Sequence, residues 1–133
     1  MSKVVTISEA ASLAIHATVL IASSDRLINV NYIAEATGAS KNHLAKVMQR
    51  LGKQGIVSSS RGPNGGFKLK RKANDLTLYD IYESIEGPIE NEGCPLDRPI
   101  CPFDKCLMGG IIYKVTDDLK TYLQKETIDK YIQ

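Results

Sequence analysis

The chain has 133 residues, of which 43% are hydrophobic and 24% are charged, which is typical of one globular domain and excludes a disordered chain. An odd number of cysteines, three, argues against a secreted disulfide scaffold. No apolar run approaches the ~20 residues that cross a bilayer, and residues 1–6 carry no secretory signal. We therefore expect a cytoplasmic protein with no membrane partner. The net charge of +2 conceals nine basic and no acidic residues over 41–72, against eight basic and fifteen acidic residues elsewhere, which indicates a polyanion-binding face rather than an ordinary solvated surface.

A first helix is predicted over residues 7–22, where apolar side chains occupy much of the helix surface. Thr6 and Glu9 have the spacing of a capping box, in which each side chain bonds a backbone N–H group of the other residue. Three polar residues at 23–25 end the helix. We therefore expect this helix to be largely buried.

Two shorter helices are predicted next. The first begins after Asn29 and ends at Gly38, and the second begins after Ser40, because Asn and Ser are good N-caps. The second helix has apolar residues at i, i+3, i+4 and i+7, namely Leu44, Val47, Met48 and Leu51. It is basic outside this stripe, and a tight turn at 37–39 joins the two helices. This is the pattern of a helix-turn-helix.

A basic β-hairpin is predicted after the helix-turn-helix. Strands at 56–60 and 67–70 flank a turn at 61–66, in which three glycines supply positive φ angles and Pro63 stiffens the chain. The glycine order matches neither of the usual nucleotide-binding loops, and no helix follows. A basic hairpin in this position is the wing of a winged helix.

The remaining residues predict one more helix of this domain, a loop and a long helix. Thr77 caps the helix at 78–85, in which Leu78, Ile81, Tyr82 and Ile85 face inward. This helix completes a winged helix-turn-helix domain over 1–87, which is mainly α-helical with one small β-hairpin.

Residues 88–106 form a loop rich in Pro and Cys. The last helix begins at Leu107, and its apolar stripe consists of Met108, Ile111, Ile112, Val115, Leu119, Tyr122 and Leu123. A small core needs no stripe of this length, so 107–133 is predicted to be a dimerisation helix and tail.

The loop at 88–106 contains all three cysteines of the chain. Cys94, Cys101 and Cys106 lie within thirteen residues, beside two prolines. Thiolates are the ligands of iron–sulfur clusters, so the loop is a candidate cluster site. Zinc is the nearer alternative, although structural zinc sites favour short paired spacings and four ligands.

The segment from Ser40 to Phe67, with its Ser60-Arg-Gly-Pro-Asn-Gly-Gly-Phe67 core, resembles the recognition helix and wing of the IscR/NsrR-type (Rrf-type) winged-helix regulators. The cysteine loop and the long final helix follow in the family's order, so the resemblance covers essentially the whole chain. It implies a bacterial homodimeric transcription factor. In several members three loop cysteines bind an iron–sulfur cluster that senses iron, redox state or nitric oxide, whereas other members lack the cluster.

The chain departs from this family at the expected fourth ligand. Gly109 stands where IscR-like members have a histidine, and Ser12 stands where nitric-oxide-sensing relatives supply a carboxylate from the other subunit. Glu9 and His16 lie one turn to either side of Ser12 on the same helix face, so they are the candidate ligands. A lone histidine on an apolar helix is more often packed in the core, and Glu9 more often only a cap. The cysteine spacing also differs from the IscR pattern, so a 2Fe–2S and a 4Fe–4S cluster both stay open.

The basic block supplies the candidate DNA contacts. Ser40, Lys41, Asn42 and Lys46 face the major groove, where Asn pairs with adenine and Lys with guanine or phosphate. Arg61 is predicted to enter the minor groove, and Lys68, Lys70 and Arg71 to contact phosphates. The half-buried His43 is interpreted as a packing residue. In a twofold dimer the two recognition helices lie ~34 Å apart on a palindromic operator of double-stranded DNA.

These features predict a DNA-binding transcriptional regulator, a repressor, that responds through a cluster at the cysteine loop. One alternative is a cluster-free thiol switch of the same fold, in which two cysteines form a disulfide under oxidant. A remote alternative is a cysteine-based redox enzyme. Two histidines, the absence of a Cys-x-x-Cys pair and the absence of a nucleotide loop argue against an enzyme.

Overall fold

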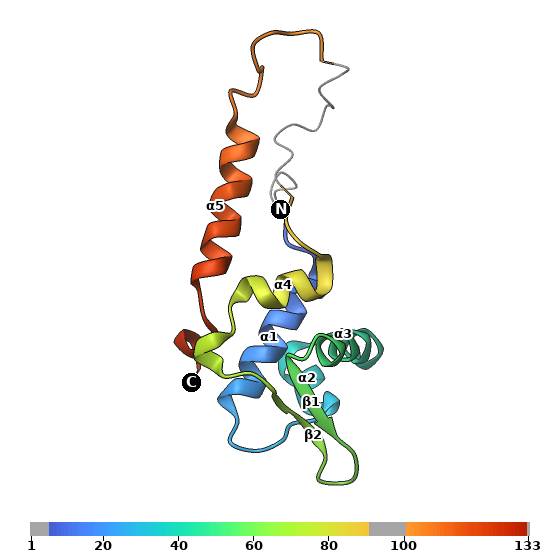
Figure 1. Ribbon diagram of the computed structural model, residues 1–133. Helices are drawn as coiled ribbons and strands as arrows, with labels where there is room; N and C mark the ends of the chain where they lie inside the picture. The colour runs from blue at the N-terminus through green and yellow to red at the C-terminus, as the bar shows by residue number, and fades with distance from the viewer. Residues whose placement is uncertain (1–5, 91–100, 133) are drawn as a thin grey trace.

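The computed structural model describes residues 6–90 and 101–132. Figure 1 shows a mainly helical fold with one hairpin, as the sequence predicts. The elements in chain order are α1 (Glu9–Ser23), α2 (Val30–Thr37), α3 (Lys41–Lys53), β1 (Val57–Ser60), β2 (Gly66–Leu69), the 3-10 helix η1 (Ala73–Asp75), α4 (Leu78–Glu86), α5 (Ile111–Lys125) and the 3-10 helix η3 (Ile128–Tyr131). None of the helices in these described ranges has the length and hydropathy of a membrane span.

Helix α1 forms the centre of the fold and packs against α2, α3 and α4. Its buried face carries small residues, Ala11, Ala14 and Ala17, which allow neighbouring helices to approach closely. The predicted capping box of Thr6 and Glu9 is wrong, because Ser8 is the N-cap and its Oγ accepts a hydrogen bond from the N–H group of Ala11 at 3.1 Å. The helix therefore begins two residues later than the sequence pattern indicates.

The helix-turn-helix has the caps that the sequence predicts. Asn29 accepts a hydrogen bond from the backbone N–H of Tyr32 at the start of α2, and Gly38 ends the helix in the left-handed conformation with φ 75°. Ser40 Oγ accepts from the N–H of His43 at 3.1 Å and begins α3. The predicted stripe of α3 is confirmed, since Leu44, Val47, Met48 and Leu51 are all buried.

The wing is an antiparallel pair whose register runs from Val57 opposite Leu69 to Ser60 opposite Gly66. A third backbone segment joins its outer edge, because the N–H of Phe67 donates to the carbonyl oxygen of Ile28 at 2.8 Å. This pairing fixes the segment between α1 and α2 (residues 24–29, called the α1–α2 segment below) to the start of β2, next to the wing turn. The sequence pattern does not predict it.

Helix α4 begins with a complete capping box, in which Thr77 and Asp80 exchange two hydrogen bonds of 3.0 Å. Leu78, Ile81 and Ile85 are buried as predicted. Tyr82 is only half-buried, and Tyr79, which the pattern missed, enters the core instead.

Helix α5 projects away from the rest of the fold (Figure 1). The prediction that it begins at Leu107 is wrong. Gly109 and Gly110 have φ angles of 61° and 76°, left-handed values that interrupt a right-handed helix, so α5 begins at Ile111. Its last turns reach the core through Leu123, and the N–H of Ile128 donates to the carbonyl oxygen of Leu76 beyond them.

Candidate nucleic-acid interface

The outer face of α3 presents polar and basic side chains to solvent. Lys41, Asn42 and Lys46 are exposed there, and Ser40 lies at the N-terminus of the helix. The buried stripe on the opposite side holds the helix against α1, α2 and α4, so the outer face has a fixed orientation. His43 is half-buried, in agreement with its interpretation as a packing residue.

The wing turn at residues 61–65 carries Arg61 at its start, and the side chain is exposed. Two glycines make this turn possible. Gly62 has φ 107°, and a Cβ atom on Gly65 would lie 2.2 Å from the carbonyl oxygen of Ser60. The tight turn therefore holds Arg61 at the end of a short, stiff hairpin.

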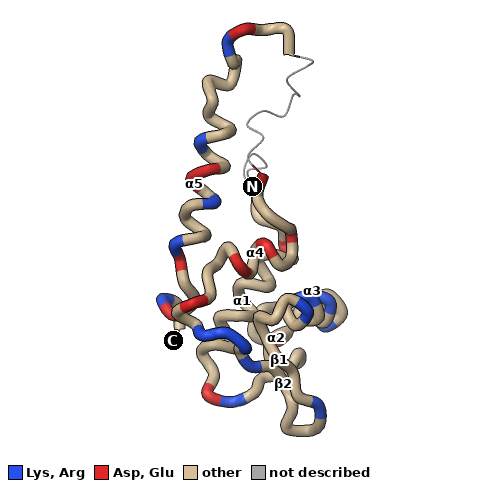
Figure 2. Tube along the Cα trace, in the orientation of Figure 1, with Lys and Arg blue, Asp and Glu red and all other residues tan. Residues whose placement is uncertain are grey.

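Lys68 on β2 and Lys70 just after it extend the basic surface beyond the turn, and both are exposed. Figure 2 shows basic positions along α3, at the wing and after β2. Five of the predicted contacts are basic, namely Lys41, Lys46, Arg61, Lys68 and Lys70, and none of these forms an ion pair within residues 6–90 and 101–132. Their charges are therefore available to a polyanion.

Arg71, for which a phosphate contact is predicted, makes contacts within the fold. Its guanidinium donates to the carbonyl oxygen of Asp75 at 2.8 Å and lies 3.3 Å from the Asp80 carboxylate. These contacts attach the end of the wing to the first turn of α4.

Two of the three cysteines belong to the described residues. Cys101 is half-buried and Cys106 is exposed, whereas Cys94 lies outside the described ranges. Among the side chains in those ranges, no three His, Cys, Asp or Glu residues come close enough together to hold a metal ion. The assignment of the cysteines to an iron–sulfur cluster therefore rests on the preference of such clusters for thiolate ligands.

The candidate fourth ligands lie on the surface of α1. His16 is exposed rather than packed in the core, and its Nδ1 lies 2.7 Å from the carbonyl oxygen of Ser12. Glu9 is exposed in the first turn of the helix, whose N-cap is Ser8. Both side chains are therefore open to contact from outside the protomer.

The start of the cysteine loop is held by α4 and α5 together. The N–H of Ile89 donates to the hydroxyl oxygen of Tyr79 at 3.1 Å, and Lys120 donates to the carbonyl oxygen of Ile89 at 3.3 Å. The Lys120 ammonium also lies 5.8 Å from the centre of the Tyr79 ring. The sequence carried no signal for this clamp, because its members are far apart along the chain.

The first half of α5 and the residues before it expose apolar side chains. Leu107 is 72% exposed, and Met108 and Ile111 are each 50% exposed. They are the N-terminal part of the predicted stripe, whereas Leu119 and Leu123 pack against the protomer's own core. The stripe thus divides into an inner end that joins the core and an outer end that nothing in the described chain covers.

The family model described as "Rrf2: Iron-dependent Transcriptional regulator" matches residues 7–133. Protein aau3 of Rhizobium meliloti is 31% identical over 116 residues, which cover 84% of this chain and 74% of that protein. A putative HTH-type transcriptional regulator of Aquifex aeolicus is 40% identical over 72 residues, 54% of this chain and 50% of the relative. The HTH-type transcriptional regulator IscR of Pectobacterium atrosepticum is 27% identical over 100 residues, 75% of this chain and 61% of the relative. The chain thus spans half or somewhat more of the latter two.

Two solved structures have the same fold. CymR of B. subtilis, described as a global cysteine regulator, superposes with a TM-score of 0.78 at 22% identity and covers 94% of each chain. The IscR structure of T. potens superposes with a TM-score of 0.74 at 24% identity and covers 95% of this chain and 85% of the other. At these identities the superpositions establish the fold alone.

Proposed function

Because the chain belongs to the Rrf2 family of transcriptional regulators, we propose that it is a cytoplasmic, homodimeric repressor that binds a palindromic operator and responds through its cysteine loop. The observation that carries this proposal is the exposed basic surface formed by α3 and the wing, whose five lysine and arginine contacts have no ionic partner in the described chain. We divide the chain into a winged helix-turn-helix domain at 1–87, an effector loop at 88–106 and a dimerisation helix and tail at 107–133.

The DNA contacts follow from the chemistry of the exposed side chains. Helix α3 enters the major groove, where Asn42 can pair with adenine and Lys41 and Lys46 with guanine or phosphate. The Ser40 hydroxyl accepts from His43, so its own proton is available to a phosphate oxygen. Arg61 enters the minor groove, whose negative potential attracts arginine. Lys68 and Lys70 contact phosphates, which position the protein without reading sequence.

The dimer forms through the uncovered outer end of the α5 stripe. Leu107, Met108 and Ile111 expose apolar area that a second copy of the chain would remove from water. A twofold axis through this helix presents two α3–wing units, which fit half-sites ~34 Å apart.

Cys94, Cys101 and Cys106 would hold an iron–sulfur cluster, because soft thiolates suit iron bound to sulfide. Glu9 or His16 of α1 is open to act as a fourth ligand. When bound, the group supplies a reversible change in charge and oxidation state. Tyr79 of α4 and Lys120 of α5 hold Ile89 at the start of the loop, so a displacement of the loop would also displace α4 and α5. The resulting shift in the angle between the two DNA-binding domains would favour or oppose operator binding.

The DNA contacts are tested by affinity measurements on a duplex that the wild-type protein selects from a random-sequence library. Arg61→Ala should weaken binding to this duplex by about 1–3 kcal/mol and reduce discrimination against a scrambled duplex. Lys70→Ala is the matched control, because removal of a phosphate-binding charge weakens both duplexes equally. Unchanged affinity and discrimination in Arg61→Ala, at fixed salt, would remove the wing from the interface.

A further inference from the structure

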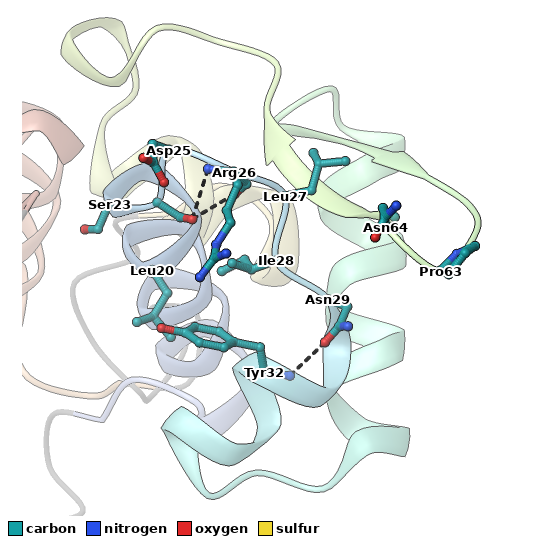
Figure 3. A pocket seen from close by; sticks show the side chains of 12 residues that line it. Leu20, Ser23, Asp25, Arg26, Leu27, Ile28, Asn29, Tyr32, Pro63 and Asn64 are labelled. Carbon is teal, nitrogen blue, oxygen red and sulfur yellow. Dashed lines mark hydrogen bonds between the residues drawn. The ribbon is translucent and has the colours of Figure 1, made fainter.

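An open groove of about 880 Å³ runs between the α1–α2 segment and the wing turn (Figure 3). The wing side of this groove is formed by Pro63, Asn64 and Gly65, which belong to the same turn as Arg61. The other side is formed by the α1–α2 segment and the first turn of α2. Neither the basic block nor the cysteine loop includes this second side.

The two sides of the groove form one rigid unit. The Phe67 N–H bonds the carbonyl oxygen of Ile28 at 2.8 Å, and Gly66 allows the backbones to meet, because a Cβ atom there would lie 2.5 Å from the same oxygen. Ser24 fixes the segment further, since its Oγ donates to the carbonyl oxygen of Arg26 and accepts from the Arg26 N–H. A partner that binds the wing turn therefore also lies close to the groove.

The groove contains a cation whose charge is not neutralised by an ion pair. Arg26 is exposed and forms no ion pair with any residue in the ranges that the structure describes. Figure 3 shows its guanidinium extending toward the Tyr32 ring, whereas the neighbouring Asp25 carboxylate points to the other side. The hydroxyl of Tyr32, which is 55% exposed, and the exposed Asn64 amide are neutral donors along the same groove.

We propose that this groove receives a backbone phosphate of the bound DNA, with Arg26 as its charged contact. The inference rests on the proposed function, in which the wing turn enters the minor groove. Because that groove is only about 6 Å wide, phosphate strands border an inserted turn on both sides. The α3 side of the wing meets one strand, and the Arg26 side meets the other. A planar guanidinium suits a phosphate, since it donates two parallel hydrogen bonds.

The test is the salt dependence of DNA affinity, measured on the selected duplex and on a scrambled duplex of equal length. The slope of log K against log salt is negative, and each phosphate that the protein no longer neutralises makes it less steep by about 0.9. Arg26→Ala should therefore make the slope less steep by about 1.8 for a dimer, equally on both duplexes. Arg26→Lys should keep most of the slope, because the charge is retained. Asp25→Asn should raise affinity on both duplexes, because it removes a negative charge beside the phosphate.

Lys125→Ala is the matched control. It removes one exposed positive charge from the last turn of α5 and should leave the slope unchanged. Circular dichroism and thermal unfolding of Arg26→Ala verify that the variant is folded. A wild-type slope in folded Arg26→Ala would overturn the proposal, as would a loss confined to the selected duplex, which would indicate base reading instead. Failure of the wild-type protein to select any duplex from the random-sequence library would instead contradict the proposed function itself.

Discussion

Replacing Gly66 with alanine tests the attachment of the wing to the α1–α2 segment. Gly66 has φ 155°, a value that side-chain-bearing residues rarely adopt, and such strain costs about 1–3 kcal/mol. The new Cβ atom would also lie 2.5 Å from the Ile28 carbonyl oxygen and 2.7 Å from its carbon. Both atoms belong to backbone, so the overlap is relieved only by moving the segment away and breaking the Phe67–Ile28 hydrogen bond, a loss of about 0.5–1.5 kcal/mol.

The expected loss in free energy of unfolding for Gly66→Ala is therefore about 1.5–4.5 kcal/mol. Urea denaturation followed by circular dichroism measures it, at one fixed protein concentration because a dimer's stability depends on concentration. Gly62→Ala is the control. Gly62 also has a positive φ, 107°, but no atom lies within 4 Å of its added Cβ, so only the strain remains. If Gly66→Ala loses no more stability than Gly62→Ala, the close approach to Ile28 does not hold the wing.

Three further predictions concern the other parts of the chain. Ile111→Lys places a charge on the uncovered apolar face, so light scattering should show a folded monomer. The control Asp117→Lys, on another face of α5, should remain a dimer. A dimeric Ile111→Lys variant would contradict the α5 interface. Cys101→Ser should abolish visible absorbance and most bound iron in protein purified without oxygen, since serine is a harder donor; colourless, iron-free wild-type protein would favour the thiol switch. Tyr79→Phe removes the acceptor for the Ile89 N–H, so hydrogen exchange at that amide should accelerate; unchanged exchange would argue against the clamp.

Much of the candidate interface could be predicted because its signals are local. Ser40 caps its helix through a residue three positions away, and the stripe of α3 repeats with the helical period, which leaves Lys41, Asn42 and Lys46 outside. The glycines of the wing turn likewise specify its conformation within a few residues. Their roles toward DNA stay predictions, but their positions on α3 and the wing are those expected.

Arg26 could not be found in this way. It is a single basic residue beside an acidic one, outside the basic block, and only the pairing of Ile28 with Phe67 brings it next to the wing. Arg71 shows the converse, since it belongs to the block by sequence, yet its contacts with Asp75 and Asp80 engage its charge in the fold.

The sequence by itself determined the helices, the hairpin and the caps of α2, α3 and α4, because these depend on hydrogen bonds and side-chain periodicity within about one helical turn. The tertiary structure alone decided choices between equally plausible local solutions. Ser8 rather than Thr6 caps α1, and the Ser8 hydroxyl also donates to Glu86, far along the chain. Tyr79 rather than Tyr82 enters the core, where it meets Ile89 and Lys120. Such choices depend on which distant segments meet, and no local pattern carries that information.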